Sequence, residues 1–88
     1  MQIVISGALL KFVNYQREHE LEASTPLTGI KVLTTRFPDL KNAIFDESGD
    51  LRKFNVVYIN KLKASSESLN VEAPSDTKVE IITAIAGG

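Results

Sequence analysis

The segment TPLTGIKVLTTRFPDL, residues 25–40, encodes a helix whose start and end can both be located in the sequence. Thr25 suits the N-cap, and the fixed φ of Pro26 suits the first helical position. Apolar residues then recur at helical spacing, at Leu27, Ile30, Leu33 and Phe37. Pro38 ends this helix because it moves the preceding residue out of the α region, and it can open a second short helix over residues 39–45.

Short strands are predicted on both sides of this helix. Residues 2–6 alternate, with Ile3 and Ile5 on one face, and residues 17–23 alternate with glutamates on one side only. The two segments predict an antiparallel hairpin with a solvated edge. After the helix, residues 54–60 (FNVVYIN) are dense in β-formers, and residues 78–84 alternate again. Between these two strands, Leu69 and Val71 are expected to anchor a minor returning strand.

The predicted order is strand, strand, helix, strand, minor strand, strand. This order favours an α+β fold, in which one main helix packs on one face of a mixed sheet of four to five strands. The first and last strands can lie parallel at the centre because the helix supplies the long crossover. That arrangement is the β-grasp topology of ubiquitin-like proteins. Residues 1–83 are predicted to form this domain, and residues 84–88 a flexible C-terminal tail ending in Gly-Gly.

The composition narrows the classes of partner and of chemistry. A net charge of −1 gives no reason to expect nucleic acid or an acidic membrane surface. The absence of cysteine excludes a disulfide framework, thiolate metal sites and a cysteine nucleophile. No apolar run approaches the ~20 residues that span a bilayer, and no signal-peptide pattern is visible, so a cytoplasmic protein is expected.

No residue pattern within the domain predicts catalysis or metal binding. His19 is the single histidine, and alternation places it on the apolar side of its strand, which favours a structural role. The glutamates at 18, 20 and 22 favour a solvated strand edge over a metal site, because nothing nearby completes a coordination sphere.

One helix cannot cover both faces of the sheet. If Ile3, Val57 and Ile81 meet the helix, alternation leaves an apolar patch on the opposite face, consisting of Val4, Val56, Tyr58 and Ile82. Such patches often mark partner sites, and the loops would rim this one with Lys11 and with Arg52 or Lys53. Homodimerisation or ordinary exposed apolar area is the alternative.

The tail consists of Ala84, Ile85, Ala86, Gly87 and Gly88. Its two glycines lack Cβ atoms, so it could enter a channel too narrow for side chains. Five extended residues reach at most about 17 Å, which is enough to enter a partner's active site. A frayed end without a function is the alternative, because chain termini are often disordered.

The segment VEIITAIAGG, residues 79–88, resembles the end of the MoaD/ThiS family of ubiquitin-like sulfur carriers, above all its CysO-type members. The likeness extends over most of the chain, through the opening strand, TPLTGIKVLTTRFPDL, IFDESGDLRKF and NVVYIN. The chain departs from the pattern before the last strand, where Asp76-Thr77-Lys78 replaces a common Gly-Asp-Glu, and at Thr83, where many relatives have proline.

The resemblance implies a carrier without a catalytic site or bound cofactor of its own. An adenylating enzyme of the ubiquitin-activating type, similar to MoeB or ThiF, would use ATP to activate the Gly88 carboxylate. A sulfur donor would then convert this group to a thiocarboxylate, and a downstream enzyme would accept the sulfur. Gly87 and the residues Ala84, Ile85 and Ala86 would be inserted into the partner with Gly88. In some relatives, a metalloprotease removes extra residues to expose Gly-Gly.

Several functions remain open at this point. A sulfur carrier for cysteine, homocysteine or a thio-metabolite agrees best with the CysO-like tail. A MoaD-like small subunit of molybdopterin synthase comes second within the same class. A ubiquitin-like modifier that forms isopeptide bonds, and an interaction module with an inert tail, are alternatives from other classes.

Overall fold

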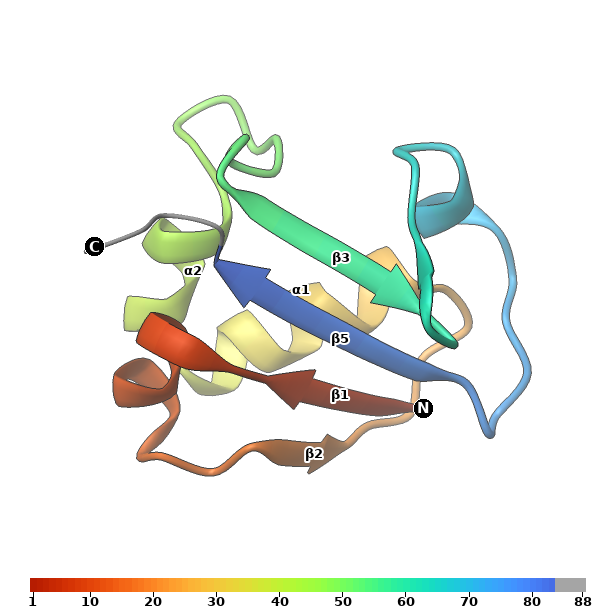
Figure 1. Cartoon of the computed structure of the whole chain (residues 1–88), viewed down its shortest axis with the longest axis horizontal. Coiled ribbons are helices and arrows are strands. Elements are labelled where there is room, and N and C mark those ends of the chain that lie inside the picture. The colour runs from red at the N-terminus through yellow and green to blue at the C-terminus, as the bar shows by residue number, and fades with distance from the viewer. Residues whose placement is uncertain (84–88) are drawn as a thin grey trace.

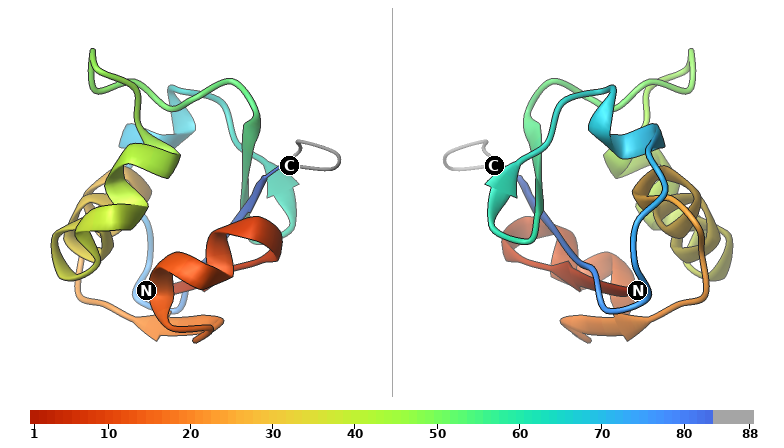
Figure 2. Two further views of the ribbon diagram at one scale, coloured as in Figure 1. Left: turned by 90° about the vertical axis from the view of Figure 1, so that its left-hand side faces the viewer. Right: turned by 90° about the vertical axis from the view of Figure 1, so that its right-hand side faces the viewer.

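The computed structural model describes residues 1–83, and the predicted tail, residues 84–88, lies outside the described residues. One five-stranded sheet packs on one face against two α-helices, α1 (Pro26–Arg36) and α2 (Pro38–Ile44), as Figures 1 and 2 show. The strands are β1 (Gln2–Ile5), β2 (Glu18–Glu20), β3 (Asn55–Ile59), β4 (Leu62–Lys63) and β5 (Lys78–Thr83). Two 3-10 helices, η1 (Gly7–Val13) and η2 (Ser68–Asn70), lie in the connections.

The sheet has the order β2-β1-β5-β3-β4, with the first and last strands of the chain paired at its centre. β1 and β5 are parallel, with Ile3 opposite Val79, and every other pair of neighbours in this sheet is antiparallel. α1 and α2 belong to the crossover between the two halves of the sheet (Figure 1). The mixed sheet predicted from the sequence is confirmed.

The local signals act as the sequence predicts. The Thr25 hydroxyl accepts a hydrogen bond from the Thr28 amide at 3.1 Å and caps α1. α1 stops before Pro38, which itself begins α2. Gly49 has a φ of 86° in the turn before β3, where a residue without a Cβ is favoured. Within residues 1–83, neither α-helix has the length and apolar content that a bilayer crossing requires.

Two expectations need correction. The second strand was expected over residues 17–23 but spans only Glu18–Glu20, because its partner β1 is only four residues long. Hydrogen bonds between Leu21 and Met1 extend the pairing by one position at the start of the chain. Residues 7–13, for which the sequence analysis predicts no element, form the 3-10 helix η1. The minor strand is β4 at Leu62–Lys63 and does not include Leu69 or Val71: Leu69 is buried in the 3-10 helix η2, and Val71 is 60% exposed. The chain leaves η2 at Val71 in extended conformation, so its side chain faces away from the core.

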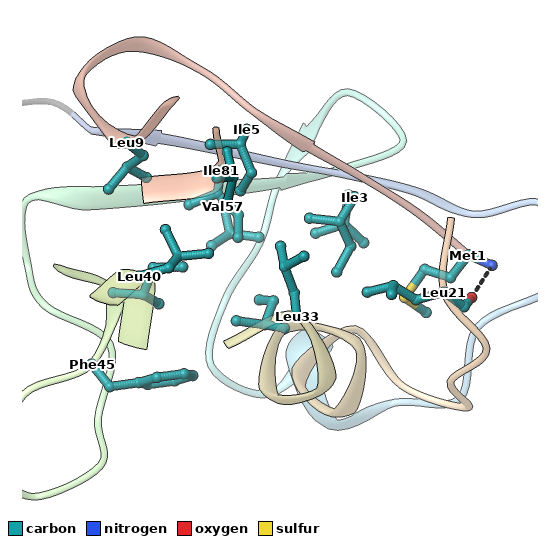
Figure 3. Packing of buried hydrophobic residues seen from close by; sticks show 14 of the residues in the cluster. Met1, Ile3, Ile5, Leu9, Leu21, Leu33, Leu40, Phe45, Val57 and Ile81 are labelled. Atoms are coloured by element: carbon teal, nitrogen blue, oxygen red, sulfur yellow. Dashed lines mark hydrogen bonds between the residues drawn. The ribbon is translucent and has the colours of Figure 1, made fainter. Parts of the chain in front are cut away.

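The core lies between the sheet and the two α-helices (Figure 3). Side chains from β1, β3 and β5 point toward Leu33 of α1 and Leu40 of α2, both of which are fully buried. The sheet contributes Ile3, Ile5, Val57, Val79 and Ile81 to this core. The buried sheet face is therefore the one that alternation predicted.

Gly29 lies where α1 approaches the start of β1. A Cβ built on Gly29 would stand 2.8 Å from the Met1 sulfur and 3.3 Å from Ile3 Cδ1. Met1 has little room to move, because it is 4% exposed and its amine donates to the Leu21 carbonyl oxygen at 2.9 Å. Close packing, not helix propensity, therefore explains the glycine.

Gly29→Ala is expected to destabilise the domain. Alanine gains about 1 kcal/mol of helix propensity, but overpacking a buried site costs about 1–3 kcal/mol, so we expect a net loss of roughly 1 kcal/mol. Chemical denaturation measures this loss. Lys31→Ala, at an exposed position of the same helix, is the matched control and should change the unfolding free energy by less than about 0.5 kcal/mol. A Gly29→Ala protein more stable than the parent would contradict the packing argument.

Candidate functional site

The sheet face turned away from α1 and α2 carries no helix of the crossover, and we call it the open face (Figure 2). Figure 1 shows it facing the viewer, with α1 behind the strands. Side chains alternate along each strand, so the neighbours of the buried residues Ile3, Val57 and Ile81 point to this face. All four residues of the predicted apolar patch, Val4, Val56, Tyr58 and Ile82, fall on it.

One row of the open face crosses all five strands in register. Glu18 lies opposite Val4, Val4 opposite Glu80, Glu80 opposite Tyr58, and Tyr58 opposite Lys63. Tyr58 therefore has a carboxylate strand neighbour on one side and an ammonium strand neighbour on the other. The sequence analysis did not find Glu80 and Lys63, because pairing across strands is not visible until the register is known.

Val4 does not belong to an exposed patch. Its side chain is 3% exposed although it points away from the helices and is not part of the main core. Its strand is flanked on both sides, and the register neighbours Glu18 and Glu80 are longer than valine. The prediction that Val4 offers contact surface is wrong.

The remaining three residues form what we call the open-face cluster, Val56, Tyr58 and Ile82. Val56 and Ile82 are directly opposite each other on β3 and β5. Ile82 is 36% exposed, and Val56 and Tyr58 are half-buried. The cluster is thus small, lies on two adjacent strands, and is bounded in register by Glu80 and Lys63.

The basic rim differs from the expectation. The Arg52 Nε donates to the Asn42 carbonyl oxygen at 2.7 Å, so Arg52 is bound to α2. The Lys11 ammonium lies 5.2 Å from the centre of the Phe12 ring within η1. Lys53 is exposed beside β3, and Lys63 of β4 supplies the cation that faces Tyr58 in register. β4 therefore contributes a charge that the sequence analysis assigned to loops.

The end of β5 is the point from which the chain continues toward residues 84–88. Thr83 pairs with Asn55, the first residue of β3, and the Thr83 hydroxyl donates to Asn55 Oδ1 at 3.1 Å. The Asn55 amide donates in turn to the Ala43 and Ile44 carbonyl oxygens, at 2.9 and 3.3 Å. Gly87, Gly88 and the inserted residues Ala84, Ile85 and Ala86 lie outside the described residues.

The histidine and the glutamates of β2 are not grouped as a catalytic or metal-binding site would require. His19 is 8% exposed, contacts the Phe37 ring edge-on at a centroid distance of 5.4 Å, and lies 2.7 Å from the Gln16 carbonyl oxygen through its Nε2. Glu18 and Glu20 are exposed, as expected for a solvated edge. Among residues 1–83, no three His, Asp or Glu side chains are grouped closely enough to hold a metal ion.

No protein-family model and no curated protein sequence matches the chain. Solved structures do match it over nearly its whole length. SAMP1 from Haloferax volcanii superposes with a TM-score of 0.86 at 17% identity, covering 99% of this chain and 97% of its own. A chain of the BexX/CysO complex from Amycolatopsis orientalis gives a TM-score of 0.82 at 25% identity, with 99% and 98% covered.

This chain has the ubiquitin-like β-grasp fold. Urm1 from Sulfolobus solfataricus superposes on the same β-grasp domain with a TM-score of 0.73 at 23% identity, covering 94% of this chain and 99% of its own. The predicted fold class is therefore confirmed. In this β-grasp domain, the open-face cluster and the end of β5 lie on the same two adjacent strands, β3 and β5.

Proposed function

We propose that the chain is a sulfur carrier of the MoaD/ThiS type, similar to its CysO-type members. The observation that carries the proposal is the full-length similarity to a chain of the BexX/CysO complex, at 25% identity, in a chain that continues from β5 into AIAGG. Similarity of fold alone would not suffice, because one fold serves many functions. The Gly-Gly segment supplies the chemical group that a carrier needs.

The proposed reaction takes place at the Gly88 carboxylate, either free or exposed by proteolytic processing. A carboxylate is a poor acyl donor because its oxygen leaves poorly. An adenylating enzyme similar to MoeB or ThiF would join this carboxylate to the AMP part of ATP and release pyrophosphate. A sulfide-level donor would then attack the acyl carbon and expel AMP, which leaves a Gly88 thiocarboxylate. The thiocarboxylate sulfur is the nucleophile that a downstream enzyme transfers into a product, for which a cysteine, homocysteine or thio-metabolite pathway is our proposal.

The β-grasp domain would provide the surface to which these partners bind. The open-face cluster offers apolar contact area on β3 and β5, with Glu80 and Lys63 beside it to fix orientation. The strand that carries Ile82 continues directly to Thr83 and the tail. A partner docked on the open face would therefore lie beside Thr83, the residue from which the tail begins.

Mass spectrometry of the intact protein tests the proposal. The chain is incubated with ATP, sulfide and its activating enzyme, and the expected product is heavier by the difference between one sulfur and one oxygen atom. Omission of ATP is the control and should leave the mass unchanged. An unchanged mass in the complete reaction, with an activating enzyme shown to be competent, would refute the carrier assignment.

A protein modifier is the second candidate, supported by the similarity to the small archaeal modifier protein 1 from Haloferax volcanii. In that case Gly88 would be joined to lysine side chains of other proteins by isopeptide bonds. The same incubation, performed with a cell extract, distinguishes the two. Conjugates of higher mass that resist thiols indicate a modifier, whereas the sulfur-substituted chain alone indicates a carrier.

A further inference from the structure

The end of β5 is connected to α2 by side chains as well as by the sheet. Thr83 Oγ1 donates to Asn55 Oδ1 at 3.1 Å, and Asn55 Nδ2 donates to the carbonyl oxygens of Ala43 and Ile44 at 2.9 and 3.3 Å. Ala43 and Ile44 are the last two residues of α2, where carbonyl groups lack partners within the helix. Asn55 Nδ2 therefore supplies a donor to the Ala43 carbonyl and a second donor to the Ile44 carbonyl, which also accepts from the Arg52 amide at 2.8 Å, while Asn55 Oδ1 accepts from Thr83.

The chemistry of this connection requires asparagine at position 55. The two carbonyl oxygens can only accept, so the Nδ2 side of the amide must face them and the Oδ1 side must face Thr83. Asn55 is 9% exposed, which fixes the orientation of its side chain and keeps water from competing with these bonds. The Thr83 hydroxyl thus has a preset acceptor in a rigid part of the domain.

We propose that Asn55 and Thr83 are positioning residues that fix the direction in which the chain leaves the β-grasp domain toward Gly88. The positioning role rests on the proposed function, whereas the hydrogen bond between Thr83 and Asn55 is independent of it. Strand ends fray unless they are tied down. A tail held extended in a partner's channel would span up to about 17 Å, so a shift of Thr83 would move the point at which the tail enters that channel. A misplacement of about 1 Å is enough to lower the rate of an enzymatic reaction considerably.

Two substitutions at Thr83 separate the hydroxyl from the side-chain shape. Thr83→Val keeps the β-branched shape and removes the hydroxyl, whereas Thr83→Ser keeps the hydroxyl. The first measurement needs no partner: amide hydrogen exchange and 15N relaxation at Ile82 and Thr83. In Thr83→Val, these amides should exchange faster and have lower backbone order parameters than in the parent. In Thr83→Ser, the order parameters should be close to those of the parent. Equal values in all three proteins, or equal losses in both variants, would overturn the inference.

The second measurement is ATP–pyrophosphate exchange with the activating enzyme. Thr83→Val should lower kcat by about threefold to tenfold, as expected for the loss of one hydrogen bond, with little change in KM because the open face still docks. Thr83→Ser should restore most of kcat. A raised KM with an unchanged kcat would contradict a positioning role. If the parent chain is not adenylated at all, the proposed function fails, and the exchange and relaxation data still decide whether the bond orders Thr83.

Discussion

Gly88→Ala is expected to lose at least about 100-fold in ATP–pyrophosphate exchange with the activating enzyme, while the domain remains folded. An adenylating site must enclose the carboxylate and the atoms next to it closely. A methyl group at position 88 would restrict φ and ψ and would collide with the walls of a channel shaped for a residue without a Cβ. The kcat/KM of pyrophosphate exchange at saturating ATP measures the loss.

The control for this experiment is Ser66→Ala, which removes a single oxygen atom at an exposed position of the loop between β4 and η2. It should exchange pyrophosphate like the parent. Circular dichroism of Gly88→Ala should match that of the parent, since residues between Met1 and Ile81 form the described hydrophobic core. If Gly88→Ala were adenylated at the rate of the parent, the terminal carboxylate would not be the reacting group.

Tyr58→Asp is expected to raise the KM for the activating enzyme by about 30-fold or more, with kcat nearly unchanged. The new carboxylate would lie opposite Glu80 in register, and docking would have to remove both from water. Ile82→Asp should act in the same direction, because Ile82 is the most exposed member of the open-face cluster, at 36%. Titration calorimetry with the activating enzyme would give the loss of affinity directly.

Thr35→Asp is the matched control for Tyr58→Asp, because it adds the same charge at an exposed position of α1 on the other side of the molecule. Its KM should equal that of the parent. Thermal melts of both variants check that the domain stays folded. Undiminished affinity in Tyr58→Asp and Ile82→Asp would remove the open face from the proposed interface, without affecting the chemistry at Gly88.

The contrast between these variants and Thr83→Val is informative. Changes on the open face act on docking and should appear in KM, whereas the loss of the Thr83 hydroxyl acts after docking and should appear in kcat. The two effects come from adjacent positions, 82 and 83, on the same strand. Alternation separates them, because Ile82 points to the open face and the Thr83 hydroxyl reaches the Asn55 side chain.

Much of the fold was predictable because its signals are local. The cap at Thr25, the stop at Pro38 and the alternation along residues 2–6 and 78–84 each depend on a few adjacent residues. The parallel pairing of the first and last strands followed from the single long crossover. Val71 and the length of β2 were not predictable in this way, because both depend on where neighbouring segments run in space.

The candidate site also has features that the sequence predicts and features that only the structure shows. Sequence placed Val56, Tyr58 and Ile82 on the face away from the helices, since alternation within one strand suffices for that. It could not reveal that Val4 is buried at 3% exposure between Glu18 and Glu80, or that Lys63 faces Tyr58, because these facts require the register of five strands. The connection from Ala43 through Asn55 to Thr83 joins residues far apart in the chain, and no sequence signal indicates it.

The sequence by itself determined the main helix, the order of the main elements along the chain, and the Gly-Gly segment on which the proposed chemistry depends. It could do so because propensity, capping and hydrophobic period act over a few residues at a time. The tertiary structure decided how the strands align, which apolar side chains stay exposed, and how Asn55 holds the end of β5 against α2. These features arise only when distant segments pack together, since a hydrogen bond across 28 positions, like that between Thr83 and Asn55, exists only in the folded chain.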